Sequence, residues 1–322
     1  MENLKQYDEL YSLPIMWWVK KKILREWSRL LFKIRFKKST AEYLGLKLNL
    51  PLTSWLGKYL VVPNEFFMSK TIHAALEIKH GVALDVGTHA GEFLVRYKAA
   101  CKSAGVDNAC YFGFEPNHAS FSFVNELINI NDWQENSNVL PVALANSTEL
   151  KTFYASRYAD PCASIHNKIN SGTKGFNSIV PVYKADELVK QLKIENISII
   201  KIDVEGAELD VIKGLKSTIE KFQPTIHCEL ANIPLEESDS NYNYILDNNR
   251  KLIKLVTELG YQSYRIIEDG EFYHHAERFK NYKAHLSGPL EINDIPHGGN
   301  YVIAHKESLS KFLSLMGHVS SK

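Results

Sequence analysis

The sequence predicts an α/β fold in which a mostly parallel sheet carries helices on both faces. Short apolar runs rich in β-branched residues recur along the chain, and helical patterns separate them. This alternation is typical of βαβ units. At two of the runs an aspartate and a glycine lead into the next helix, first Asp85 with Gly87 and then Asp203 with Gly206. Ligands bind outside the carboxyl ends of strands in such sheets, so both turns mark an expected site.

Composition places the chain among ordinary globular proteins. Of its 322 residues, 45% are hydrophobic and 23% are charged, which is enough apolar material for a large core. The formal net charge of +1 gives no overall positive field, so we expect no nucleic-acid partner. Four cysteines fit neither a zinc motif nor a disulfide framework, and no apolar run is long enough to span a bilayer. We therefore expect a cytoplasmic protein.

Apolar runs predict the strands, and apolar residues three or four positions apart predict the helices. In the helix expected at residues 117–130, for example, Phe121, Val124 and Leu127 share one face. Strands are predicted at residues 82–86, 110–114, 139–144, 197–202, 225–228, 261–267 and 301–304. Helices are predicted at residues 91–101, 117–130, 186–193, 208–219 and 250–259.

Three segments lie outside this alternation. Residues 1–60 are predicted to be a basic amphipathic helical extension, since Ile23, Trp27 and Leu30 share a helical face among clustered Lys and Arg residues. Residues 15–38 of it suit peripheral contact with an anionic membrane surface, self-association, or packing on the protein's own domain. That domain is predicted at residues 61–322, with polar insertions at about 156–178 and 269–299 that would overhang the site.

The turn after the first strand suits the polar end of a cofactor. Asp85, Gly87 and Gly91 form a D-x-G-x-x-x-G pattern, in which glycine lets the backbone approach a ligand and the helix N-terminus offers free N–H groups. This is not the G-x-G-x-x-G pattern that binds pyrophosphate. At the end of the second strand, Glu115 can accept both hydroxyls of a ribose. Together these segments indicate an adenosine cofactor with an amino-acid end, such as S-adenosylmethionine.

Four ordered segments carry a resemblance to a known family. They are Leu-Asp-Val-Gly-Thr-His-Ala-Gly-Glu from residue 84, Gly-Phe-Glu-Pro-Asn from residue 113, Pro-Val-Ala-Leu-Ala-Asn from residue 141 and Ile-Lys-Ile-Asp-Val-Glu-Gly-Ala-Glu from residue 200. The chain resembles the FkbM-type methyltransferases. The resemblance implies the class I methyltransferase fold, a Rossmann-like sheet of seven mostly parallel strands whose last strand is antiparallel. It also implies S-adenosylmethionine-dependent O-methylation, commonly of a sugar or polyketide hydroxyl.

The resemblance also implies cofactor contacts at positions of this chain. Around the methionine end it places residues of the first turn, namely Asp85, Gly87, Thr88, His89 and Gly91. The pair Thr88-His89 departs from the Ala-Asn of many relatives. Glu115 would hold the ribose, and Pro116, Asn117 and Ala143 would lie near the adenosine. Asp203 would lie beside the sulfonium.

Residues after the fourth and fifth strands are candidates for catalysis. A sugar hydroxyl is a poor nucleophile, and a positioned base gives about a 10²–10⁴-fold acceleration. Glu205 is our first candidate for this base and His227 the second, with Asp203, Glu229 and Lys201 close by. Lys201 shares a sheet face with Asp203 and would lower its pKa or orient a hydroxyl.

Other interpretations of these residues stay open. Glu205 would instead cap the following helix, and His227 would be a buried structural residue. Asp203, Glu205 and Glu229 would also suit Mg²⁺, because hard cations bind carboxylate oxygens, but we expect a site without a metal. In the first insertion, Ser164 and His166 are weaker candidates for contact with the acceptor.

The sequence therefore predicts an S-adenosylmethionine-dependent O-methyltransferase that acts on a hydroxyl, with a sugar or glycan as the expected acceptor. Two alternatives stay open. A nicotinamide-dependent Rossmann oxidoreductase would need a pyrophosphate-binding turn that residues 85–91 do not supply. A catalytically inactive docking domain would retain the binding residues without turnover.

Overall fold

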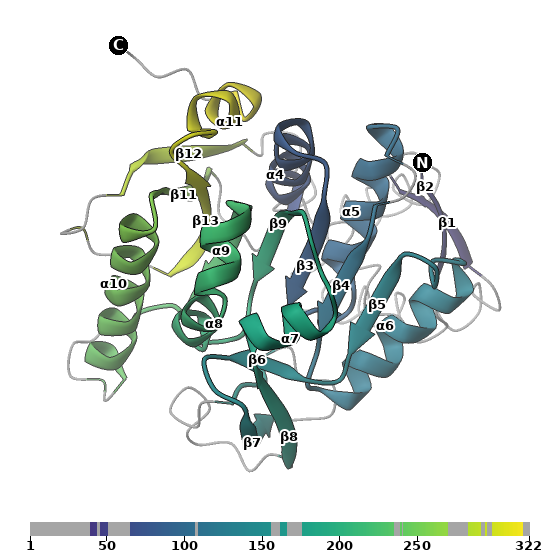
Figure 1. The fold of residues 1–322 in the computed structure, drawn as a ribbon, viewed down its shortest axis with the longest axis horizontal. Coiled ribbons are helices and arrows are strands. Elements are labelled where there is room, and N and C mark those ends of the chain that lie inside the picture. The colour runs from purple at the N-terminus through teal and green to yellow at the C-terminus, as the bar shows by residue number, and fades with distance from the viewer. Residues whose placement is uncertain are drawn as a thin grey trace, which may run out of the picture.

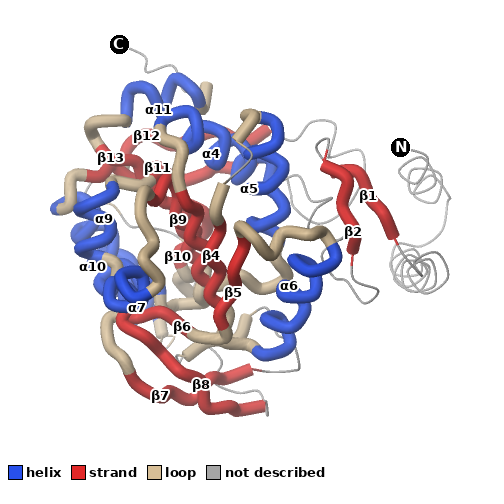
Figure 2. Tube along the Cα trace, turned by 45° about the vertical axis from the view of Figure 1, so that its right-hand side comes forward, coloured by secondary structure: helices blue, strands red, loops and turns tan. Residues whose placement is uncertain are grey.

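An eight-stranded sheet forms the centre of the molecule (Figure 1). The computed structural model describes residues 39–43, 46–50, 65–106, 109–155, 162–165, 176–234, 239, 241–269, 283–290, 294 and 298–317. The strand order is β12-β11-β13-β10-β9-β3-β4-β5. Helices cover both faces of this sheet, as Figure 2 also shows, so the predicted α/β architecture is confirmed.

The middle of the sheet is parallel and its far edge is antiparallel. The parallel strands are β10 (Thr225–Leu230), β9 (Ile197–Ile202), β3 (Val82–Val86), β4 (Tyr111–Phe114) and β5 (Ser137–Leu140). The last strand, β13 (Gly299–His305), is antiparallel to β10. Beyond it lie β11 (Tyr261–Asp269) and β12 (Lys283–Pro289).

Strand β12 corrects the expected seven-stranded sheet. We expected residues 269–299 to be a polar insertion, but β12 lies within them and pairs antiparallel with β11. A strand at the edge of a sheet presents unpaired N–H and C=O groups, which a further strand can satisfy. The sheet therefore has eight strands.

The helices separate into two layers. One layer holds α4 (Glu65–Ile78), α5 (Glu92–Ser103), α6 (His118–Ile130) and α11 (Leu309–Leu315). The other holds α7 (Ala185–Gln191), α8 (Glu208–Gly214), α9 (Lys216–Phe222) and α10 (Tyr242–Glu258). Because both layers cover β9, its Ile197, Ile199, Ile200 and Ile202 are all fully buried. This two-sided burial explains its unbroken apolar sequence.

The strand predicted at residues 139–144 is two strands. Strand β5 ends at Leu140, and β6 (Ala143–Ala145) belongs to a separate three-stranded sheet with β8 (Phe176–Lys184) and β7 (Glu149–Ala155). Pro141 has no N–H to continue the ladder, and the Val142 N–H donates to the Leu140 carbonyl in a tight turn. The small sheet places residues of the first insertion next to the central sheet.

The helix predicted at residues 208–219 is also interrupted, between α8 and α9. A Cβ on Gly214 would lie 2.0 Å from the Ala145 carbonyl oxygen. The end of α8 therefore packs directly against β6, and only glycine allows this approach. The helix predicted at residues 250–259 begins earlier, at Tyr242.

Part of the expected helical extension is a hairpin. Strands β1 (Ser39–Tyr43) and β2 (Leu46–Leu50) pair antiparallel, and the fully buried Leu48 packs in the core beside α5. Residues 15–38, where we expect the amphipathic helix, lie outside the described residues. None of the helices in the described part of the chain combines the length and the apolar character needed to cross a membrane.

Candidate functional site

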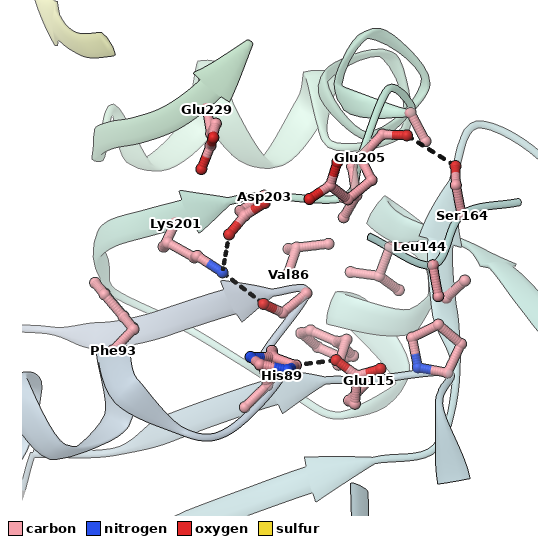
Figure 3. Close-up of a pocket in the computed structure, with 18 of the residues that line it drawn as sticks. Val86, His89, Phe93, Glu115, Leu144, Ser164, Lys201, Asp203, Glu205 and Glu229 are labelled. Atoms are coloured by element: carbon pink, nitrogen blue, oxygen red, sulfur yellow. Dashed lines mark hydrogen bonds and ion pairs between the residues drawn. The ribbon is translucent and has the colours of Figure 1, made fainter. Parts of the chain in front are cut away.

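A cavity of about 400 Å³ opens where the parallel strands end. Its wall combines the turn after β3, the end of β4, the loop after β9 and the end of β10 (Figure 3). Residues from α4, α5, β6, β7, β11, β13 and the first insertion also line it. Cofactor pockets are typically of this size. The predicted meeting of the turns after β3 and β9 is therefore confirmed.

The turn after β3 is shaped by its glycines. Gly87 has φ +85°, and a Cβ there would lie 1.8 Å from the Asp203 carbonyl oxygen, so the turn touches the loop after β9. Gly91 has φ +79° and precedes α5 as its N-cap residue. Thr88 and His89 line the cavity with Gly87. Asp85 and Gly91 are not among the lining residues of the described chain, so both lie behind the turn rather than on its surface.

Glu115 is held in place by two backbone donors. Its side chain is 6% exposed, Oε2 accepts a hydrogen bond from the His89 N–H at 2.7 Å, and Oε1 accepts one from the Asn117 N–H at 2.8 Å. Each carboxylate oxygen keeps a further lone pair, which a ribose hydroxyl can use. Burial raises the pKa of Glu115 to about 7, against the effect of the two backbone hydrogen bonds.

The predicted neighbours of Glu115 differ in where they lie. Pro116 and Ala143 line the cavity. The Asn117 side chain instead caps α6, accepting hydrogen bonds from the Ala119 and Ser120 N–H groups at 3.0 and 3.4 Å. Asn117 is not among the lining residues of the described chain, so it supports Glu115 from behind.

Lys201 connects the two loops. Its ammonium lies 3.5 Å from Asp85 Oδ1 and 3.3 Å from Asp203 Oδ2, and it donates to the Gly87 carbonyl at 2.5 Å. Burial favours the neutral amine, but Asp203 and Asp85 together outweigh it and raise the pKa of Lys201 above its usual range. The lysine is therefore charged, and it joins the turn after β3 to the acidic end of β9.

Glu205 faces the cavity and does not cap α8. The Gly206 and Val204 N–H groups donate to Glu208 Oε1 at 2.8 and 3.4 Å. Glu208, and not Glu205, therefore binds the backbone N–H groups before α8. Glu205 lines the cavity and turns its carboxylate toward Asp203 in Figure 3. Burial, with the charges of Asp203 and Glu229, raises the pKa of Glu205 to about 8.

His227 lines the same cavity but is almost fully buried. It is 3% exposed, and its Nε2 lies 3.1 Å from Asn300 Oδ1. Its Nδ1 is buried without a hydrogen-bond partner in the described part of the chain. Burial lowers the pKa of His227 to about 4, so the ring is neutral at pH 7. Glu205 is the more accessible base of the two, and His227 fits the structural interpretation better.

The first insertion reaches the site through Ser164. Its hydroxyl donates to the Glu205 backbone carbonyl at 2.8 Å, and Ser164 lines the cavity between Ala163 and Ile165. His166 lies outside the described residues. The described residues include no group of three His, Cys, Asp or Glu side chains arranged to hold a metal ion.

Several lining residues were missed by sequence reasoning. They are Met68, Glu92, Phe93, Phe153, Ile266 and Asn300. Glu92 follows Gly91 in the first turn of a helix, and this position alone could have identified it. Phe93 is the next residue of the same helix, α5. Met68, Phe153, Ile266 and Asn300 come from distant helices and strands and carry no local signal, because only the tertiary fold brings them to the cavity.

Comparison with known proteins places the chain in a family. A methyltransferase FkbM from Methylobacillus flagellatus KT shares 13% identity and a TM-score of 0.39, over 69% of this chain and 43% of that one. An O-methyltransferase from Bacillus cereus in complex with SAH shares 10% identity and a TM-score of 0.42, over 74% and 80%. Neither similarity is high enough to inform on activity.

No curated protein sequence shows significant similarity. The family described as "Methyltransferase FkbM domain" matches residues 85–263, which is more than half of the chain and includes the loops around the cavity. This chain belongs to the FkbM methyltransferase domain family.

Proposed function

We propose that this chain is an S-adenosylmethionine-dependent O-methyltransferase whose acceptor is a hydroxyl of a sugar or glycan. Family membership supports methyl transfer and argues against the nicotinamide-dependent alternative. One observation carries the cofactor proposal. The turn after β3 and the carboxylate of Glu115, which backbone N–H groups orient, lie side by side in the wall of one cavity.

The residues present fit the proposed cofactor. Glu115 would accept the ribose hydroxyls, Ala143 and Pro116 would border the base, and Thr88 and His89 would surround the amino-acid end. The carboxylates of Asp203 and Glu205 would lie on the side of the sulfonium. When bound, S-adenosylmethionine supplies an electrophilic methyl group. The chain supplies position and charge around it.

Glu205 is the proposed base. In the cofactor-free protein its carboxyl holds a proton near neutral pH, because burial and neighbouring acids raise its pKa to about 8. The positive charge of a bound sulfonium would favour the ionised form of Glu205. Glu205 would then take the proton from an acceptor hydroxyl, while Lys201 keeps Asp203 oriented. Asp203 and Glu229 would accept hydrogen bonds from other hydroxyls of the acceptor.

The charges of the wall favour an acceptor without negative charge. Five acidic residues line the cavity, namely Glu92, Glu115, Asp203, Glu205 and Glu229. Among the described lining residues Lys201 is the only Lys or Arg, and its ammonium is already shared by Asp85, Asp203 and the Gly87 carbonyl. A phosphorylated or carboxylated acceptor would meet acidic side chains whose lining counterion, Lys201, is already shared, whereas a neutral sugar can donate hydrogen bonds from its hydroxyls to the carboxyl oxygens.

Mass spectrometry of a panel of acceptors tests the proposal. Neutral sugars and oligosaccharides are incubated with enzyme and S-adenosylmethionine, beside matched uronic acids and sugar phosphates. We expect a product heavier by one CH2 unit from a neutral member, because a methyl group replaces the hydrogen of one hydroxyl. Methyl transfer to nitrogen or carbon would contradict O-methylation. Cofactor binding without transfer to any acceptor would favour the inactive docking domain.

A further inference from the structure

Glu205 has an unusual backbone for its residue type. Its φ is +53°, in the left-handed region, and Gly206 follows with φ +98°. Glycine adopts such angles freely, but the Cβ of glutamate makes them sterically costly. Residues in this state persist when surrounding contacts hold them, and they cluster at functional sites. The contacts that hold Glu205 therefore matter for where its carboxylate points.

Two side chains hold this loop from opposite sides. Glu208 Oε1 accepts from the Gly206 N–H at 2.8 Å, which fixes the loop to its own helix α8. Ser164 Oγ donates to the Glu205 carbonyl at 2.8 Å, and it comes from the first insertion, 41 residues earlier (Figure 3). The peptide unit after Glu205 is thus held at its oxygen by Ser164 and at its nitrogen by Glu208.

Ser164 is itself firmly placed. It is 1% exposed. Its backbone pairs with Tyr154 of β7 in an antiparallel bridge, with N–H to carbonyl hydrogen bonds of 2.9 and 3.0 Å. Tyr154 in turn pairs with β8 in the small sheet. The hydroxyl therefore presents a fixed donor to the Glu205 carbonyl.

We propose that Ser164 is a positioning residue, which fixes the backbone of Glu205 so that the carboxylate faces the acceptor. The inference rests on the proposed function, in which Glu205 is the base. It replaces our expectation that Ser164 contacts the acceptor directly. The hydroxyl donates to Glu205, and the wall of the cavity at this point also includes the flanking Ala163 and Ile165.

A double-mutant cycle tests this role. Ser164→Ala removes the donor and should lower kcat about 10-fold while the KM values stay within about 2-fold, because small displacements of a base reduce turnover strongly. In a Glu205→Gln background the same change should alter kcat by less than about 2-fold, because the carboxylate that Ser164 is proposed to position is absent. Ser164→Thr keeps a hydroxyl and should recover kcat.

Ser198→Ala is the matched control. Ser198 is also a buried serine, and its hydroxyl donates to the Val82 carbonyl at 3.3 Å, at the opposite end of β9. This variant should keep wild-type kcat. The proposal is overturned if Ser164→Ala lowers kcat no more than Ser198→Ala does, or lowers it equally with and without the Glu205 carboxylate.

A titration separates this inference from the proposed function. Carbon-13 NMR of labelled carboxyl groups, with Glu205→Gln for assignment, follows the protonation of Glu205 in the cofactor-free protein. Ser164→Ala should release the loop toward solvent and lower the pKa of Glu205 toward its usual range. If wild-type protein transfers no methyl group, the proposed function fails, and an unchanged titration of Glu205 overturns the role of Ser164 independently.

Discussion

Burial raises the pKa of five carboxyl groups at and behind the cavity, the buried Asp85 among them. It does so to about 7 for Glu92, Glu115 and Glu208 and to about 8 for Glu205. Glu92 pairs with Arg96 at 3.2 Å, and the Lys201 ammonium is already shared by Asp85 and Asp203. Acids so placed are common at functional sites. A positive ligand charge would relieve their repulsion.

The titration of Glu205 predicts a pH-dependent stability difference. The folded protein binds the proton of the Glu205 carboxyl more tightly than the unfolded chain does. The stability that this protonated carboxyl contributes is therefore fully present below the pKa of an unperturbed glutamate, and it is lost as the pH rises through about 8. Glu205→Gln mimics the neutral form. Its Tm, measured by calorimetry without cofactor, should exceed the wild-type Tm by about 2–4 °C at pH 9 and match it near pH 5. A constant difference across this range would contradict the raised pKa.

Glu115 predicts a loss of cofactor affinity. Glu115→Gln keeps the size of the side chain but removes charge-assisted hydrogen bonds, each worth about 1.5–3 kcal/mol, which corresponds to roughly a 10–100-fold weaker Kd for S-adenosylmethionine. The exposed Glu126 on α6 provides the control variant Glu126→Gln, which should bind normally. Equal affinity of the two variants would remove Glu115 from the cofactor site.

Sequence reasoning at this scale found residues next to strand ends and missed contacts made over a distance. Glu115, Lys201, Asp203, Glu205 and Glu229 line the cavity as expected. The bond from Ser164 to the Glu205 carbonyl could not be predicted, because it depends on how the first insertion folds back beside β7. The hydrogen bond from the Gly206 N–H to Glu208 could not be predicted either, since Glu205 and Glu208 both follow β9 within six residues.

At the scale of elements, the contact between the turn after β3 and the end of β9 builds the site. Gly87 lets the two backbones meet, and Lys201 bridges them with its ammonium. The strands on either side were predictable from their apolar runs. The division of residues 139–144 into β5 and β6 was not, because the run continues through Pro141 while the partner strand changes.

Gly87→Ala tests this contact. The added Cβ would lie 1.8 Å from the Asp203 carbonyl oxygen at φ +85°, so the loops must separate. We expect a loss of at least about 2 kcal/mol in the free energy of unfolding, together with weaker cofactor binding. Gly105→Ala has a similar φ of +68° but nothing within 4 Å, so it should cost about 1 kcal/mol and leave binding intact. Denaturant unfolding of both variants measures the difference, and equal costs would show that the close approach is unimportant.

At the scale of the whole molecule, the fold gathers segments between Met68 and Asn300 at one edge of the sheet. The alternation of strands and helices made this edge predictable, since the carboxyl ends of parallel strands meet there. The additional strand β12 was not predictable because it lies in the polar segment 269–299. The three-stranded sheet was not predictable because β8 pairs with β6 and β7 across the first insertion.

The charge distribution predicts turnover without a metal. The Lys201 ammonium lies between Asp85 and Asp203, where a divalent cation would otherwise be attracted. Dialysis against EDTA should leave kcat within about 2-fold of the untreated enzyme, since the Lys201 ammonium already neutralises these carboxylates. Loss of activity that added Mg²⁺ restores would contradict this expectation.

Calorimetric titration of the purified protein with S-adenosylmethionine tests the central claim most directly. We expect one cofactor to bind per chain, with S-adenosylhomocysteine competing for the same site and NAD giving no heat. Binding should depend on the carboxylate of Glu115, whose two oxygens are oriented by backbone N–H groups. If neither S-adenosylmethionine nor S-adenosylhomocysteine bound to the folded protein, the cavity beside Glu115 would not be a methyl-donor site.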